Sequence, residues 1–190
     1  LFSGGTVILF PPPYEPSDLI EAASKYEATT LLLVPTLLRQ LLELPDGGTP
    51  LLAGLNRLLS TGAILYPDER QAVLDRLNPN FINYYGSTEG GGTSVLLPKH
   101  SGAAAASVGE PIYQTEIQIV GEDGAELPRG EVGELVCKSP SNMQGYWNLP
   151  DATKGALKDG WMHTGDAAYM DEDGYVYIQD RIKDMIISGG

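Results

Sequence analysis

Basic side chains are scarce in this sequence. Its 190 residues hold 12 Lys and Arg against 25 Asp and Glu, which gives a formal net charge of −13. Nucleic acids and anionic membrane surfaces are bound through clustered Lys and Arg, so the composition argues against both kinds of partner. A polyanionic substrate would have to be held by a few local groups rather than by a long-range field.

Cysteine and long apolar runs are scarce as well. The one cysteine, Cys137, excludes an internal disulfide, and its apolar surroundings predict a buried thiol. No apolar run reaches the ~20 residues that a membrane-spanning helix needs, and the first residues show no signal-peptide pattern. We therefore expect a cytoplasmic protein without a transmembrane segment. Because the sequence begins without Met and stops after an apolar run, we interpret it as an internal piece of a longer protein.

The first half of the chain alternates short apolar runs with helical patterns. The apolar runs predict strands at residues 6–10, 31–34, 57–60 and 81–84. The helical patterns predict helices at residues 17–27, from Thr36, and from Pro67. The spacing of Asp18 and Glu21 resembles an N-terminal capping pair for the first helix. Strands that alternate with helices are typical of a parallel sheet covered by helices, so we predict an α/β fold.

The second half has a different pattern. After Leu97 the helical periodicity disappears, and short alternating runs lie between Gly turns. They predict strands at residues 116–120 and 131–138 and a hairpin over residues 168–178. Such short strands are typical of a small antiparallel sheet or barrel.

This change divides the chain into two expected subdomains. We predict an α/β subdomain, a parallel sheet flanked by helices, at residues 1–97 and a small antiparallel β-barrel-like subdomain at residues 98–180. Residues 98–107, with a Gly and four Ala, would connect the two. At this length the chain can bury a substantial core.

The first candidate for chemistry is the run YYGSTEGGGT at residues 84–93, directly after a predicted parallel strand. Ligands of parallel α/β sheets bind at the carboxyl ends of the strands. Gly residues let backbone N–H groups approach phosphate oxygens, a carboxylate such as Glu89 can hold Mg²⁺, and a Tyr ring can stack on a base. A Gly-rich turn with a solvated Glu explains these residues equally well, so this run alone does not decide between the two.

Two further candidates lie towards the end of the chain. Residues 159–166, DGWMHTGD, form a predicted loop in which the carboxylate of Asp166 could accept hydrogen bonds from both hydroxyls of a ribose. Residues 180–190, DRIKDMIISGG, join charged residues to an apolar strand and a Gly turn. Taken singly, a turn aspartate and a solvated charged link are the simpler explanations.

Taken together and in this order, the three runs resemble the adenylate-forming superfamily of acyl-CoA synthetases, firefly luciferase and the adenylation domains of peptide synthetases. The resemblance includes the turn at residues 60–63 and the run from Gly133 through Tyr146 to Thr153, and it covers essentially the whole chain. The sequence is most similar to fatty-acid–CoA ligases. The resemblance implies ATP and Mg²⁺ as cofactors, a carboxylic acid as substrate and CoA as co-substrate.

The resemblance also implies which residues hold the adenine. Tyr85 is similar to the aromatic residue beside the adenine, and Gly62 with Ala63 would line the other part of that pocket. Gly86 and Ser87 belong to the same nucleotide-binding loop.

Other matching residues would hold the phosphates, the metal and the ribose. The resemblance implies that Thr88 contacts the α-phosphate and that Glu89 is the Mg²⁺ ligand. Asp166 would bind the ribose hydroxyls, and Arg181 would reach the ribose and phosphate. Of these, Thr88, Glu89 and Arg181 would be the catalytic residues.

Residues 181–190 resemble the hinge and the start of the small C-terminal domain, with Lys183 as the hinge residue where many members carry Asp. Gly189 and Gly190 would begin the loop that lines the pantetheine tunnel. The superfamily's phosphate loop with its Lys lies upstream of this sequence, and its catalytic C-terminal Lys lies downstream. We therefore expect the 190-residue chain alone not to catalyse carboxylate-dependent ATP–pyrophosphate exchange.

The acid substrate is open at this point. We favour a fatty acid, because residues 90–92, all Gly, would leave space beside the adenylate, and on that hypothesis Gly91→Trp should shorten the accepted chain. An aryl-CoA ligase is the second candidate, and an enzyme that loads a carrier protein is the third.

A serine hydrolase is the rival enzyme class, since Ser87, His163 and Asp166 are all present. The nucleophile elbow requires Gly two residues after the Ser, and Glu89 stands there instead. We expect His163 to be a structural loop residue and His100 to be solvated.

Overall fold

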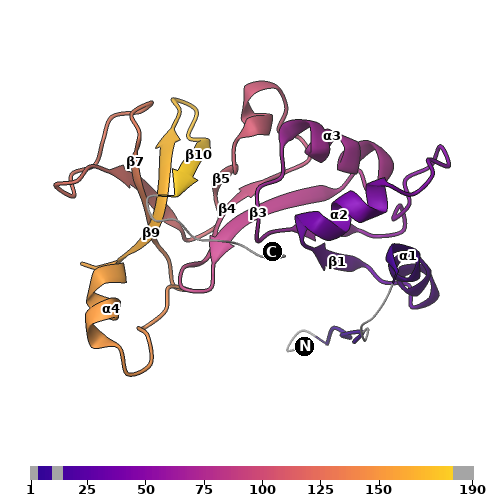
Figure 1. The fold of residues 1–190 in the computed structure, drawn as a ribbon, viewed down its shortest axis with the longest axis horizontal. Coiled ribbons are helices and arrows are strands. Elements are labelled where there is room, and N and C mark those ends of the chain that lie inside the picture. Colours follow the sequence, from indigo (N-terminus) through magenta and orange to yellow (C-terminus); the bar gives the residue numbers. More distant parts are fainter. Residues whose placement is uncertain (1–3, 10–14, 182–190) are drawn as a thin grey trace.

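The computed structural model describes residues 4–9 and 15–181, with side chains as far as Gln179. Over these residues the chain forms two five-stranded sheets. Figure 1 shows the sheets side by side in an elongated molecule, with the helices α1, α2 and α3 gathered on the first sheet.

The first sheet is mixed, with the strand order β1-β2-β3-β4-β5. Its strands are β1 (Thr30–Leu33), β2 (Arg57–Ser60), β3 (Phe81–Ser87), β4 (Gly91–Leu96) and β5 (Glu110–Pro111). The strands β1, β2 and β3 are parallel, as predicted, but β4 and β5 pair antiparallel. The prediction of a parallel sheet was wrong for this edge, because only three residues join β3 to β4 and a turn that short permits only antiparallel pairing.

Proline begins each of the three helices of the first sheet, which are α1 (Pro16–Lys25), α2 (Pro35–Leu42) and α3 (Pro67–Arg76). The first N–H of a helix has no hydrogen-bond partner within the helix. Proline, which lacks an N–H, therefore loses no hydrogen bond at this position. Asp18 takes part in the N-terminal cap of α1, but its partner is Glu15 and not the predicted Glu21: the Asp18 carboxylate accepts a hydrogen bond from the Glu15 N–H at 2.8 Å. The second helix starts at Pro35, one residue before the predicted Thr36.

The helices and the first sheet share one hydrophobic core. Its fully buried side chains come from α2, β2, α3 and the start of β3, and they include Leu38, Leu58, Val73 and Phe81. The predicted strand at residues 6–10 is wrong for its described part: residues 6–9 form no strand, and Leu9 is 87% exposed.

The second sheet is antiparallel, with the order β10-β9-β7-β6 and β8 paired to β9. Its strands are β6 (Glu116–Val120), β7 (Gly133–Lys138), β8 (Leu157–Lys158), β9 (Trp161–Met170) and β10 (Val176–Arg181). A short helix, α4 (Pro150–Ala156), precedes β8, and a 3₁₀ turn at Gly102–Ala106 precedes β5. The predicted strands and the hairpin of this half are confirmed, with small shifts at their ends.

A second core lies under the second sheet and contains Leu135, Cys137, Met162 and Val176. Cys137 is fully buried, as predicted, and burial raises the pKa of its thiol. The first sheet takes β5 from beyond Leu97, so the switch between sheets falls after Pro111 rather than after residue 97.

His100 is buried between the two halves, with 6% of its surface exposed, so the prediction of a solvated side chain was wrong. Its Nδ1 accepts a hydrogen bond from the Leu97 N–H at 3.1 Å, and its carbonyl accepts one from the buried Arg70 guanidinium at 3.2 Å. Its Nε2 lies 3.5 Å from the Glu110 carboxylate, and its ring meets the Tyr175 ring edge-on at 5.2 Å. These contacts tie α3, β5 and the β9–β10 hairpin together.

Protonation of His100 is expected to destabilise the fold. Burial lowers the pKa of the His100 imidazole, against the opposing pull of Glu110 and with smaller lowering by Lys99 and Arg70. Because the folded-state pKa lies below the unfolded value of about 6.5, the stabilisation is complete above that pH and is lost as the pH falls through the folded-state pKa. The free energy of unfolding, obtained from urea unfolding between pH 5 and pH 8, measures this pH dependence. His100→Asn should flatten the pH dependence, and an unchanged slope would contradict the assignment.

Candidate functional site

The turn that joins β3 to β4 carries the first predicted site residues. Thr88 and Glu89 stand at its tip, and the Ser87 hydroxyl accepts a hydrogen bond from the Gly90 N–H at 2.9 Å, which closes the turn. Ser87 and Thr88 are exposed, whereas Glu89 is half-buried. The turn therefore carries two exposed hydroxyl side chains and a half-buried carboxylate.

The glycines around this turn are needed for close packing. A Cβ on Gly86 would stand 2.2 Å from the Gly91 carbonyl oxygen, and one on Gly92 would stand 1.7 Å from the Tyr84 hydroxyl. Gly91 has φ +67°, and a Cβ there would lie 2.5 Å from the Ser141 hydroxyl. The expectation that the glycines leave open space was therefore wrong at Gly91. Gly91→Trp would disrupt the turn, so it cannot report chain length.

Residues 139–146, in the second half of the chain, form hydrogen bonds to the turn between β3 and β4. The Met143 N–H donates to the Glu89 carbonyl at 2.7 Å, and the Ser141 hydroxyl donates to the Gly90 carbonyl at 3.3 Å. The Tyr146 hydroxyl donates to Oε1 of Glu89 at 3.0 Å. Burial and this carboxylate raise the pKa of Tyr146. Sequence reasoning did not assign Tyr146 to the site, although it lies in the run that carried the family resemblance.

Tyr85 and Asp166 meet across the two sheets. The Tyr85 hydroxyl, on β3, donates a hydrogen bond to Oδ2 of Asp166, on β9, at 2.5 Å. Asp166 is only 5% exposed, and Tyr85 packs against the second core. Burial, followed by the Asp166 charge, strongly raises the pKa of the Tyr85 hydroxyl. The hydroxyl therefore stays protonated and continues to donate to the carboxylate.

Gly62 and Ala63 lie at the same edge of the first sheet as Tyr85. They follow the carboxyl end of β2, whose last residue, Ser60, pairs with Asn83 of β3. Gly62 is exposed with φ +97°, and Ala63 is half-buried. The carboxyl ends of β2 and β3, which carry the residues of the predicted adenine pocket, thus lie next to each other, as expected for neighbouring parallel strands.

Part of the predicted site lies at the limit of the described residues. The backbone of Arg181, the last residue of β10, pairs with Asp166 of β9. Its side chain lies outside the described part of the structure, and so do Lys183, Gly189 and Gly190.

No hydrolase constellation forms among the described residues. Ser87 is engaged with the Gly90 N–H, and Nδ1 of His163 lies 2.8 Å from Oε2 of Glu134. His163 stands in the strand β9, so the prediction of a loop residue was wrong. The run at residues 159–166 is mostly strand, because its residues pair with β7 and β8.

Glu89 stands by itself as a candidate cation ligand. In the described ranges, no group of three or more His, Cys, Asp or Glu could hold a metal ion. Mg²⁺ in nucleotide sites is commonly held by one or two carboxylates together with the phosphates, so a half-buried carboxylate beside the Ser87 and Thr88 hydroxyls suits it.

Across residues 4–9 and 15–181, no helix is long and apolar enough to cross a bilayer.

The fold and this arrangement define the class. A family model described as "AMP-binding enzyme" matches residues 1–147, and the chain belongs to this family of adenylate-forming enzymes. It is 39% identical over its full length to a feruloyl-CoA synthase of Amycolatopsis and 35% identical to the medium/long-chain-fatty-acid–CoA ligase FadD8 of Mycobacterium tuberculosis. It covers 38% and 34% of these two relatives, so it spans little more than a third of their length.

Solved structures show the same fold. The amide bond synthetase McbA from Marinactinospora thermotolerans superposes with a TM-score of 0.85 at 35% identity, over 92% of this chain and 36% of that one. The O-succinylbenzoate CoA synthetase MenE from Bacillus subtilis, in complex with ATP and magnesium, gives 0.80 at 30% identity, over 93% and 36%.

Proposed function

We propose that this chain forms the nucleotide-binding part of an acid–thiol ligase, which activates a carboxylate as acyl-AMP and transfers the acyl group to CoA. The observation that carries the proposal is the contact between Tyr85 and Asp166, which joins the two sheets beside the Glu89 turn. The Tyr85 ring, the buried Asp166 carboxylate and the half-buried Glu89 carboxylate thus lie in adjoining segments, and the family is described as AMP-binding.

Asp166 is proposed to bind the ribose. Its Oδ2 accepts the Tyr85 hydroxyl, and a carboxylate can accept further hydrogen bonds from the two ribose hydroxyls. The same contact fixes the Tyr85 ring, which we propose lies beside the adenine together with Gly62 and Ala63. Arg181, whose backbone pairs with Asp166, is proposed to serve the ribose and phosphate side.

The Glu89 turn is proposed to hold the phosphates and the metal. Thr88 is exposed at the tip and would donate to the α-phosphate, while Ser87 and Gly86 shape the turn. Glu89 would hold Mg²⁺, which would neutralise phosphate charge. The Tyr146 hydroxyl orients the Glu89 carboxylate for this purpose.

The proposed reaction has two steps. A carboxylate oxygen attacks the α-phosphorus of ATP, which forms acyl-AMP and releases pyrophosphate. The thiolate sulfur of CoA then attacks the acyl carbonyl and releases AMP. The residues of this chain would orient the nucleotide for in-line attack and stabilise its charge, which is how phosphoryl-type transfers are mainly accelerated.

A fatty acid remains our first candidate for the acid, with an aryl acid second. FadD8, at 35% identity, supports the first, and the feruloyl-CoA synthase, at 39%, supports the second. Transfer to a carrier protein is a further candidate, since a fatty acid–[acyl-carrier-protein] ligase of Streptomyces coeruleorubidus is 36% identical to the chain.

Carboxylate-dependent ATP–pyrophosphate exchange by the whole protein tests the proposal. The acids would be saturated fatty acids of graded length and hydroxycinnamic acids, followed by acyl transfer assays with CoA and with a carrier protein as acceptors. We expect exchange with at least one acid and thioester formation with CoA. Absence of exchange with every acid, from a folded protein with Mg²⁺ present, would overturn the proposed function.

A further inference from the structure

The pairing of β7 with β9, the strand that carries Asp166, shifts its register next to Asp166. Residues 134 and 136 of β7 pair with residues 167 and 163 of β9, so two steps along β7 match four along β9. β9 therefore bulges around Gly165, which has φ +73° and nothing within 4 Å of where a Cβ would stand. Glycine is required there for its backbone angle and not for space.

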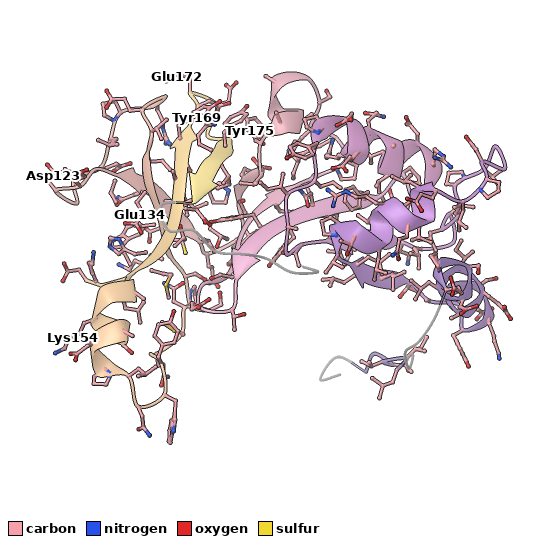
Figure 2. The ribbon with its side chains drawn as sticks, in the orientation of Figure 1. Asp123, Glu134, Lys154, Tyr169, Glu172 and Tyr175 are labelled. Carbon is pink, nitrogen blue, oxygen red and sulfur yellow. The ribbon has the colours of Figure 1, made fainter. Side chains whose placement is uncertain are left out.

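Glu134 holds this bulge from the neighbouring strand. Its Oε1 accepts a hydrogen bond from the Gly165 N–H at 3.1 Å, and its Oε2 lies 2.8 Å from Nδ1 of His163. The side chains of Glu134 and His163 are mostly covered, at 25% and 15% exposed. Figure 2 shows Glu134 on the second sheet, close to β9. One carboxylate therefore links the residue at the start of the bulge to a backbone group inside it.

Thr164 completes the support. Its hydroxyl donates to the Leu135 carbonyl at 2.7 Å and accepts the Asp166 N–H at 3.1 Å. The N–H groups of Gly165 and Asp166 thus both have side-chain acceptors, and β7 supplies contacts on both sides of the bulge. These contacts hold the backbone at Asp166, whose carboxylate is buried against the Tyr85 hydroxyl.

We propose that Glu134, together with His163, is a positioning residue that sets the β9 bulge so that the Asp166 carboxylate meets the nucleotide ribose. This inference rests on the proposed function, in which Asp166 binds the ribose hydroxyls. Glu134 acts through the Gly165 N–H. A change at Glu134 should therefore alter ribose recognition selectively and leave recognition of the acid unchanged.

The test compares the KM for ATP with the KM for 2′,3′-dideoxy-ATP in carboxylate-dependent pyrophosphate exchange by the whole protein. Glu134→Ala should raise the KM for ATP about tenfold and barely change that for the dideoxy analogue, because one charge-assisted hydrogen bond that orders the bulge is lost. Glu134→Gln keeps an oxygen that can accept the Gly165 N–H, so it should retain most of the preference for ATP. A ratio of KM values does not depend on the folded fraction, so loss of stability alone would not move it.

Glu110→Ala is the matched control, since Glu110 is another strand glutamate beside a histidine, His100, at 3.5 Å. It should leave the preference for ATP unchanged. Absence of exchange by the unchanged protein would mean that the proposed function fails. If exchange occurs but Asp166→Asn does not change the preference, the proposed contact between Asp166 and the ribose fails, and the positioning inference fails with it. If Asp166→Asn abolishes the preference but Glu134→Ala preserves it, only the positioning inference fails. A further fall when Glu134→Ala is added to Asp166→Asn would also overturn the inference, because Glu134 is inferred to act through Asp166.

Discussion

Asp166→Asn is expected to slow carboxylate-dependent ATP–pyrophosphate exchange by about 100-fold, through a higher KM for ATP. Hydrogen bonds to a charged group contribute about 1.5–3 kcal/mol each, and a factor of ten corresponds to about 1.4 kcal/mol, so weakening two ribose contacts accounts for this size. Asn has the same shape as Asp and keeps one oxygen to accept the Tyr85 hydroxyl, so the sheets should stay joined. Steady-state kinetics in ATP, with CD spectra of both proteins, measure the effect.

Tyr85→Phe is the control for this substitution. It removes the 2.5 Å hydrogen bond to Asp166 but keeps the aromatic ring and the carboxylate. We expect a loss of tenfold or less, because the ribose contacts remain and only one contact within the protein is lost. Equal effects of Tyr85→Phe and Asp166→Asn would show that Asp166 matters for joining the sheets rather than for the nucleotide.

Glu89→Gln is expected to lower the exchange rate by about 100-fold at low millimolar Mg²⁺. The amide keeps the shape of the side chain and can still accept the Tyr146 hydroxyl, but it lacks the charge that holds a hard cation. The apparent affinity for Mg²⁺ should fall, and raising the Mg²⁺ concentration should restore part of the rate. The measurement is the exchange rate as a function of Mg²⁺ at saturating ATP.

Tyr146→Phe distinguishes a metal ligand from a packing residue at this turn. It removes the 3.0 Å contact to Glu89 and leaves the charge, so the Mg²⁺ dependence should shift only slightly. A Glu89→Gln protein whose rate falls equally at all Mg²⁺ concentrations would contradict the assignment of Glu89 to the metal.

Local patterns predicted many elements of the fold correctly. The strands at Arg57–Ser60 and Glu116–Val120 and the start of the helix at Pro67 were predicted at their observed positions. Apolar runs of strand length and a proline before an acidic first turn are signals that neighbouring residues determine. The strand β4 was missed, because its glycines are typical of a turn and only their packing against Tyr84 and Ser141 explains them.

Burial of polar groups was the main source of error. His100 was expected in solvent, but the Leu97 N–H, the Glu110 carboxylate and the Tyr175 ring surround it. The residues before Asp166 were expected in a loop, but they form a bulged strand held by Glu134. Tyr175 and Glu134 lie on segments distant in the sequence from His100 and Gly165, and no local pattern identifies them as partners.

The sequence by itself determined the family, the order of the chemistry-bearing runs and the alternation of strands and helices, because each depends on residue types at short spacing. The tertiary structure alone decided that the first sheet is mixed, that Tyr85 and Asp166 are joined, and that Tyr146 contacts Glu89. Tyr85 and Asp166 lie 81 positions apart, and Tyr146 and Glu89 lie 57 apart. Contacts over such separations form only when the sheets and loops pack, and the energy of burying their polar groups together selects the partners.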